Sequence, residues 1–402
     1  MPRTIYLCGA GGKGNVGAEA IMLAIIKLFQ SRYRDVRFIL TSWYPERVRQ
    51  LLSRIGGNFA AVRRESILSD PREIRQADFF VICGDVSMSE TVVTFLPLHY
   101  GIRVLTARLL GTRTLLLGIE AEKIRKWYNL WAIKHLIGNQ AVRYILRNEQ
   151  SYENLRKLPV DPSTLLLGCE PSLMLPDSCC QGFEYGNGRL SGSKLRVGFG
   201  LRDHFTQPFR VNLLKGTLER RDASPGQIPV AMRRIIDFTA RVGDYLVEKH
   251  SAQLIFIPHH HLEGKDRVIM TDREIAERVI GKMRAPRDVV LIEDHLHPFT
   301  VLDLYRKLDL AISMRHHTNS FACYHRVPTL GYGISEKMVN FFHQVGKEDM
   351  LLDPLSEDFE KVQERIDRAI GDREKISADL GHALGDLRSQ MSSALDRALA
   401  NA

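Results

Sequence analysis

The feature that most constrains the fold is a series of short, continuous apolar runs that alternate with helical patterns. Residues 78–83 read DFFVIC and end at Gly84, and residues 112–119 read TRTLLLGI. Uninterrupted runs of this length are typical of parallel strands buried on both faces, since half-exposed strands alternate apolar and polar residues. Four more runs occur in the first half of the chain, at residues 3–7, 36–41, 143–146 and 164–167. They predict a parallel sheet covered by helices.

A change in composition divides the chain. Residues 177–194 are rich in Gly and Ser and poor in apolar residues, which is typical of a linker. The strand pattern then restarts, at residues 195–201, 253–257, 289–292, 308–313 and 329–332. From residue 357 onward, apolar residues recur at helical spacing.

These boundaries predict an α/β protein with two Rossmann-like domains that face a cleft. The expected domains are residues 1–176 and 195–356, with the linker over 177–194 between them and a helical tail over 357–402. In sheets of this kind, ligands bind outside the carboxyl ends of the strands.

Composition excludes several classes of protein. The 402 residues contain no run of about 18 apolar residues, and the N-terminus lacks the apolar stretch of a signal peptide. A cytoplasmic protein is therefore expected. The six cysteines include no C-x-x-C pair, so a zinc site or a disulfide framework is not expected. The net charge of +9 favours an anionic ligand or partner, such as a phosphate, a nucleic acid or an anionic lipid headgroup.

A glycine-rich stretch, CGAGGKGNVGAEA, follows the first strand at residues 8–20. It lacks the features of two nucleotide-binding loops, namely the dinucleotide-binding loop and the phosphate loop. No carboxylate ends the next strand, and Lys13 is followed by Gly14 rather than by Ser or Thr. The stretch can serve an anion or a polar ligand at the start of a helix, or only a tight turn. Glu19 lies beside it, in the first turn of the expected helix.

Ionisable residues follow three strands of the second domain. Arg315, His316 and His317 come directly after the strand at 308–313, Lys337 begins the helix after 329–332, and Arg202 ends the strand at 195–201. Arg can clamp a carboxylate or phosphate with two hydrogen bonds, Lys adds a point charge, and His moves protons near neutral pH. Arg315, His317 and Lys337 are expected to meet at one rim. Arg202 joins them or forms an ion pair at the surface or between domains.

Further histidines occur at 259–261, 295 and 297. They could bind a transition metal. However, no Asp, Glu or Cys stands at a recognisable ligand spacing, and consecutive histidines of a short loop cannot all bind one ion. We therefore expect no metal, and histidines that line the mouth of the cleft.

Four segments carry a family resemblance. They are Asn15–Ile21 written NVGAEAI, the segment Arg147 to Ser151, the strand that ends in Arg202, and residues 313–337, where Arg-x-His precedes a small-residue helix, Val-Pro and Lys337. Together they resemble the polysaccharide pyruvyl transferase family, whose members move pyruvate from phosphoenolpyruvate onto a sugar as a cyclic ketal. The resemblance implies a fold similar to GT-B glycosyltransferases and neither metal nor other cofactor.

For the donor side, the resemblance implies that Arg202, Arg315 and Lys337 bind phosphoenolpyruvate in the second domain. His317 is then the expected general acid, in preference to His316.

For the acceptor side, the resemblance points to the first domain, with Asn15, Gly17 and Asp85 in contact with the sugar. Glu19 is the expected base, ahead of Asp85 and Glu90. The sugar can be lipid-linked or nucleotide-linked, and peripheral membrane association stays open.

Three rival interpretations remain. A GT-B glycosyltransferase that uses a nucleotide sugar would share the fold, with Glu336 holding the ribose. A non-catalytic protein that binds carbohydrates or anions is suggested by departures from the family pattern at Ala18 and at residues 83–85. A nucleic-acid partner is not expected, because the basic residues are scattered.

Overall fold

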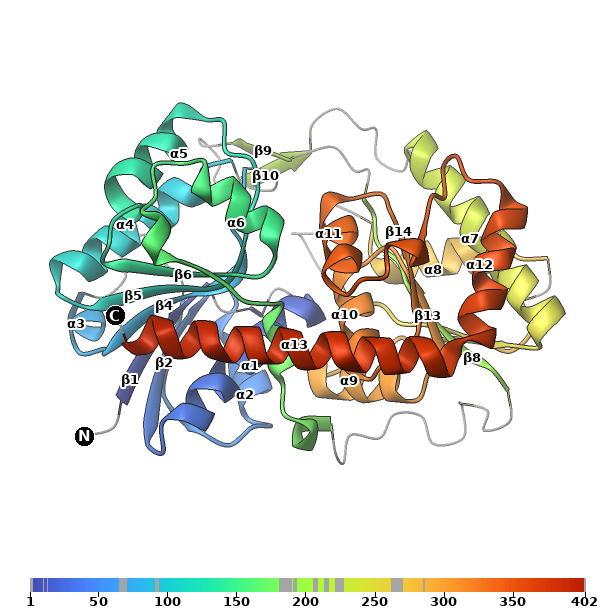
Figure 1. The fold of residues 1–402 in the computed structure, drawn as a ribbon, viewed down its shortest axis with the longest axis horizontal. Helices are drawn as coiled ribbons and strands as arrows, with labels where there is room; N and C mark the ends of the chain where they lie inside the picture. The colour runs from blue at the N-terminus through green and yellow to red at the C-terminus, as the bar shows by residue number, and fades with distance from the viewer. Residues whose placement is uncertain are drawn as a thin grey trace. The chain divides into compact units, whose positions relative to one another are not determined.

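The computed structural model describes residues 3–9, 11–12, 14–64, 71–90, 94–180, 190, 194–204, 209–212, 217–220, 228–261, 270–284 and 286–400. Contacts divide the chain into two units. Met1–Pro176 and Asp386–Ala402 form the first, and Asp177–Gly385 forms the second. In each unit, helices pack around a parallel sheet (Figure 1).

The first unit has a seven-stranded sheet in the order β3-β2-β1-β4-β5-β6-β7, and every pair of neighbours is parallel. This is the order of a Rossmann-like sheet. The strands are β1 Arg3–Cys8, β2 Val36–Ser42, β3 Asn58–Arg64, β4 Phe79–Met88, β5 Arg113–Ala121, β6 Val142–Leu146 and β7 Leu165–Leu167.

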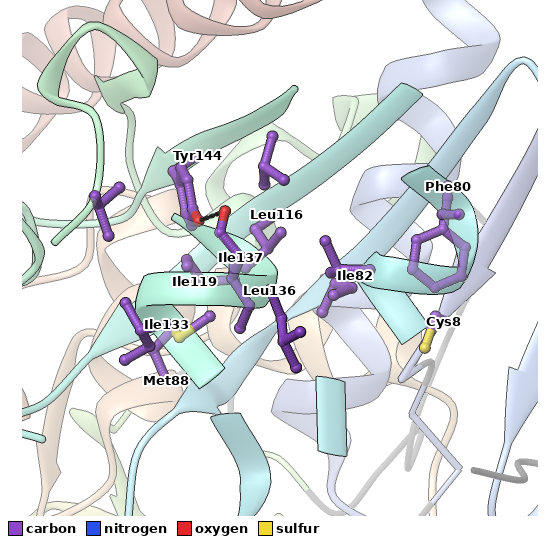
Figure 2. Packing of buried hydrophobic residues seen from close by; sticks show 14 of the residues in the cluster. Cys8, Phe80, Ile82, Met88, Leu116, Ile119, Ile133, Leu136, Ile137 and Tyr144 are labelled. Carbon is purple, nitrogen blue, oxygen red and sulfur yellow. Dashed lines mark hydrogen bonds between the residues drawn. The ribbon is translucent and has the colours of Figure 1, made fainter. Parts of the chain in front are cut away.

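Helices connect these strands. They are α1 Val16–Arg32, α2 Pro45–Leu52, α3 Pro71–Arg75, α4 Leu96–Leu109, α5 Trp127–Ala132, the π-helical turn η1 Ile133–Ile137, α6 Glu149–Arg156, η2 Pro162–Thr164 and η3 Pro171–Met174. One core cluster packs α4 and η1 against the middle of the sheet (Figure 2). Within it, the Tyr144 hydroxyl donates to the carbonyl of Ile137 at 2.7 Å, which fixes β6 to η1.

The second unit has a six-stranded parallel sheet in the order β12-β11-β8-β13-β14-β15, again Rossmann-like. Its strands are β8 Arg196–Gly200, β11 Gln253–Phe256, β12 Val289–Leu291, β13 Leu310–Ser313, β14 Thr329–Tyr332 and β15 Leu351–Leu352. A separate antiparallel pair joins β9 Phe209–Asn212 and β10 Thr217–Arg220.

The helices of this unit are η4 Asp177–Cys180, α7 Val230–His250, α8 Asp272–Ile280, α9 Pro298–Arg306, α10 His316–Tyr324, α11 Glu336–Gln344, η5 Glu348–Met350 and α12 Phe359–Gly371. The last helix, α13 Arg373–Ala400, belongs to the second unit up to Gly385 and to the first from Asp386. Its final turns cover α1, where Arg32 donates to Ser392 Oγ at 2.7 Å and pairs with Asp396.

The apolar runs of the sequence all form strands, but two expectations need correction. The run at 78–83 was expected to end at Gly84, whereas β4 continues to Met88. Gly84 permits this because the strands approach closely there: a Cβ at Gly84 would lie 2.4 Å from the Gly118 carbonyl oxygen. The strand β3 was not expected, because its sequence NFAAVRR forms a half-exposed sheet edge without an apolar run.

Candidate functional site

In the second unit, the side chains expected on the donor side follow three neighbouring strands. β11, β8, β13 and β14 are adjacent and parallel, so their carboxyl ends share one edge of the sheet. Arg202 follows β8, Arg315 and His317 follow β13, and Lys337 lies in the first turn of α11, after β14. We call this edge the cationic edge. The structure thus places the four expected donor-side residues after adjacent strands.

Arg315 is the most firmly held of these residues. Its side chain is buried and forms an ion pair with the buried carboxylate of Asp272, the first residue of α8. Its Nε donates to the carbonyl of Leu201 at 3.0 Å, and its backbone N–H donates to Ser313 Oγ at 2.7 Å. The guanidinium is therefore fixed before any ligand binds.

Asp272 also organises the end of β11. Its Oδ2 accepts the backbone N–H groups of His259 at 2.9 Å and of His260 at 3.0 Å. Sequence reasoning missed this residue, because the Thr271–Glu274 capping box marks it as an ordinary helix start. An Asp at a helix start does not by itself indicate a pairing with Arg315. The two residues meet because of the order of the strands in the sheet.

His317 lies in the first turn of α10, where no side chain caps the helix. The backbone N–H groups and the dipole of such a helix end favour an anion. The turn packs tightly on β8: a Cβ at Gly200 would lie 1.9 Å from Thr318 Oγ1. Only glycine therefore fits at the end of β8.

The neighbouring histidines are held neutral. Burial first, and then Arg315 and His317, lower the pKa of His259 well below its ordinary value. Burial and the same Arg315 lower the pKa of His260 to about 4. Burial followed by Arg202 lowers the pKa of His204. These three histidines therefore carry no positive charge at neutral pH, and Arg202 and Arg315 lie within electrostatic range of them.

The histidine clusters have structural contacts. His259 Nε2 lies 2.8 Å from the Tyr305 hydroxyl, His261 stacks on His295 with ring centroids 4.6 Å apart, and His297 caps α9 through the N–H of Phe299 at 3.2 Å. Among the residues that the structure describes, no group of three or more His, Cys, Asp or Glu is arranged to hold a metal ion.

In the first unit, the glycine loop joins β1 to α1. Asn15 caps α1, and its Oδ1 accepts the N–H groups of Gly17 at 3.1 Å and Ala18 at 3.4 Å. Gly12 has a φ of +96°, and a Cβ there would lie 3.0 Å from the carbonyl oxygen of Tyr44. The loop is thus folded closely onto the end of β2, while Asn15 and Gly17 share the first turn of α1.

Glu19 is fully buried and forms a two-pronged ion pair with Arg47 of α2. Arg47 Nε and Nη2 each lie 3.2 Å from a carboxylate oxygen of Glu19. Burial raises the pKa of Glu19, and Arg47 opposes that shift. Of the other expected bases, Glu90 accepts the N–H groups of Arg125 and Lys126 and the amide of Asn129, and the side chain of Asp85 lies outside the described part.

The segment from Arg147 to Ser151 has a structural place in this unit. Arg147 is buried between Glu120 and Glu170, and its Nη1 lies 2.8 Å from Glu170 Oε2. Ser151 Oγ accepts the N–H of Ala121 at 3.1 Å. These contacts tie the ends of β5 and β6 to the segment after β7.

Fold and site together define an α/β protein of two Rossmann-like domains with the GT-B-like class of fold. The sheet orders and the likeness to solved structures confirm that expectation. The UDP-GlcNAc 2-epimerase of Neisseria meningitidis, bound to UDP-GlcNAc, has a TM-score of 0.59 at 13% identity, with 100% of each chain covered. HepE of Anabaena in complex with UDP has a TM-score of 0.59 at 12% identity, covering 98% of this chain and 100% of its own.

The UDP-GlcNAc 2-epimerase of Methanocaldococcus jannaschii is also similar, with a TM-score of 0.52 at 12% identity and coverage of 92% and 93%. A comparison with curated proteins gives no match. The family model of polysaccharide pyruvyl transferase matches residues 15–336. The chain belongs to the polysaccharide pyruvyl transferase family, as the sequence resemblance predicts.

Proposed function

We propose that the protein transfers pyruvate from phosphoenolpyruvate to a sugar of a polysaccharide or glycan precursor, with release of phosphate. The observation that carries the proposal is the cationic edge, where Arg202, Arg315 and Lys337 follow three neighbouring strands and His317 lies in the first turn of a helix that no side chain caps. Family membership supports transferase chemistry.

Phosphoenolpyruvate carries a carboxylate and a phosphate on three carbons, so its site needs several cations close together. Arg315 offers a guanidinium already oriented by Asp272, and Arg202 and Lys337 add charge on either side. The first turn of α10 adds N–H groups for the phosphate or the carboxylate. Prior orientation of these groups lowers the cost of binding and of reaching the transition state.

The reaction can be balanced with two sugar hydroxyls. A proton from His317 is added to the methylene carbon, which becomes the methyl group and leaves C2 electrophilic. One hydroxyl oxygen attacks C2, the C2–O bond to phosphate breaks, and the second hydroxyl closes the ketal. Of the two hydroxyl protons, one restores the acid and the other leaves with phosphate. A base near the hydroxyls belongs to the acceptor side.

Glu19 remains the proposed base, with Asn15, Gly17 and Asp85 as acceptor contacts. The raised pKa of Glu19 suits a proton acceptor, since an ideal base has a pKa near the working pH. Glu19 is buried and paired with Arg47, so its carboxylate must separate from Arg47 and become accessible to the sugar before it can accept a proton.

A transfer of hexose from a nucleotide sugar is the alternative. It is favoured by the similar structures, of which one is bound to UDP-GlcNAc and another is in complex with UDP, and by Glu336, an exposed carboxylate in the first turn of α11.

Phosphate release from phosphoenolpyruvate across a panel of free, lipid-linked and nucleotide-linked sugars tests the proposal, with mass spectrometry of the products. We expect a pyruvylidene gain on one acceptor class. Turnover with a nucleotide sugar alone, seen as a hexose gain, would overturn the proposal in favour of the alternative.

A further inference from the structure

Two tryptophans of the first unit face outward from one short helix. Trp127 is 77% exposed and Trp131 is 49% exposed, and both lie on α5, one turn apart. Such exposure is rare for tryptophan, whose large apolar surface is normally covered. The chain has only three tryptophans, so two thirds of them stand on this one face.

Positive charge surrounds the two rings. Lys123, Arg125, Lys126 and Lys134 are all exposed, and none of these side chains forms an ion pair with another residue that the structure describes. From residue 123 to residue 148 the sequence contains no Asp or Glu. We define the α5 patch as Lys123, Arg125, Lys126, Trp127, Trp131 and Lys134.

The nearby carboxylates do not neutralise the patch. Glu90 faces backbone N–H groups and the amide of Asn129, and Glu122 accepts the hydroxyl of Ser89 at 2.6 Å. Both are thus occupied by polar groups of the protein. The four exposed cations are therefore available to an anionic molecule or surface outside the protein.

The residues of α5 and η1 that lie beneath the α5 patch are buried and fix its position. Asn129 and Ala132 are fully buried, as are Ile133 and Ile137 of η1, and Leu136 is nearly so. The Asn129 amide donates to the carbonyl of Thr94 at 2.8 Å and to Glu90 at 2.7 Å. The tryptophans therefore protrude from an anchored surface, and they do not need a partner to complete the core.

We infer that the α5 patch docks the protein on an anionic lipid surface, with Trp127 and Trp131 in the interface and the four cations among the headgroups. Tryptophan with surrounding Lys and Arg is the composition of helices that lie in a membrane interface. An apolar protein partner would leave the cations unpaired. None of the helices in the described ranges is both long and apolar enough to cross a bilayer, so the contact would be peripheral.

Cosedimentation with vesicles tests the inference and does not depend on the reaction. We expect the wild-type protein to bind vesicles of phosphatidylcholine with phosphatidylglycerol, to bind phosphatidylcholine alone weakly, and to lose binding as salt rises. W127A/W131A should bind the anionic vesicles about tenfold more weakly or worse. K123E/K126E should show a loss of similar size.

Matched controls distinguish the effect of the α5 patch from the effects of net charge and of exposed apolar side chains elsewhere in the first unit. R54E/K157E changes the net charge of the first unit by the same amount at exposed sites outside the patch, and L109A removes an exposed apolar side chain of α4. Both should bind like the wild type, and thermal unfolding should be unchanged in every variant.

Tryptophan fluorescence gives a second readout. Trp43→Phe leaves only the two patch tryptophans, whose emission should shift to the blue with anionic vesicles, whereas W127F/W131F should show no shift. The inference is overturned if the wild type ignores anionic vesicles, or if W127A/W131A binds them as well as the wild type does. It is also overturned if the wild type is a dimer in solution that W127A/W131A converts to a monomer, because a second copy would then cover the patch.

Discussion

The guanidinium of Arg315 is paired with the carboxylate of Asp272, although 43 positions separate them in the chain. Asp272 also accepts two backbone N–H groups at the end of β11. The ion pair therefore links the ends of β11 and β13, across β8 between them. It fixes the direction of Arg315 in a buried setting, where an unpartnered charge would be costly.

Asp272→Asn should remove the ion pair that orients the Arg315 guanidinium. We expect kcat/KM for phosphoenolpyruvate to fall by about a hundredfold, because the proposed donor-binding guanidinium is then misplaced. KM for the acceptor should stay nearly unchanged. The matched control is Asp244→Asn, since Asp244 is an equally buried carboxylate that pairs with Arg284 elsewhere in the same unit. It should lower stability alone, and an equal loss of donor affinity in the control would contradict the positioning role.

His317→Ala should abolish turnover while the fold stays intact, because it removes the proposed general acid. His325→Ala, at the other end of α10, is the control and should retain activity. Steady-state phosphate release measures the turnover of both variants, and thermal unfolding shows whether their fold is intact. Near-wild-type activity in His317→Ala would remove His317 from the mechanism.

Gly200→Ala should destabilise the second unit by about 2 kcal/mol, since its Cβ would overlap Thr318 Oγ1. The double variant G200A/T318A should recover part of that loss, because the clashing hydroxyl is gone, whereas the close contacts with the Cβ of residue 318 at 2.7 Å and with Ser313 Oγ at 2.8 Å stay. Urea unfolding of the four proteins of this cycle measures the coupling. Additive losses would show that the contact is not as tight as the structure has it.

Arg47→Ala should destabilise the first unit by about 3 kcal/mol at neutral pH, because it leaves the buried Glu19 carboxylate without its partner. Arg47 holds down a pKa that burial raises, so its removal raises the pKa of Glu19 further. A carboxyl with a raised folded pKa binds more protons when folded, so its stability contribution falls as pH rises above the unfolded value of 4.5.

The loss in Arg47→Ala should therefore shrink as the pH is lowered toward and then below 4.5, because Glu19 becomes protonated first in the folded state and, below 4.5, in the unfolded state as well. Free energies of unfolding over that range measure this. A loss that is constant with pH would mean that Glu19 does not carry the effect.

Much of the fold can be predicted from the sequence, because buried parallel strands must be continuously apolar. The positions of Arg202, Arg315 and Lys337 after neighbouring strands follow from the same pattern. The partners of these residues could not be predicted. Asp272 looks like a helix start, and the pairing of Glu19 with Arg47 depends on how α2 packs against α1. Local pattern does not encode such long-range contacts.

The outward face of α5 could not be predicted either. Tryptophans at this spacing are normally a core stripe, and only their exposure distinguishes a surface from a core.

The most direct test of pyruvyl transfer is the reaction run in deuterium oxide with phosphoenolpyruvate and an acceptor from the panel. Protonation of the methylene carbon predicts a product with a pyruvylidene group whose methyl carries one solvent deuterium, and one phosphate released for each product formed. A hexose gain from a nucleotide sugar with no phosphate released from phosphoenolpyruvate would contradict it.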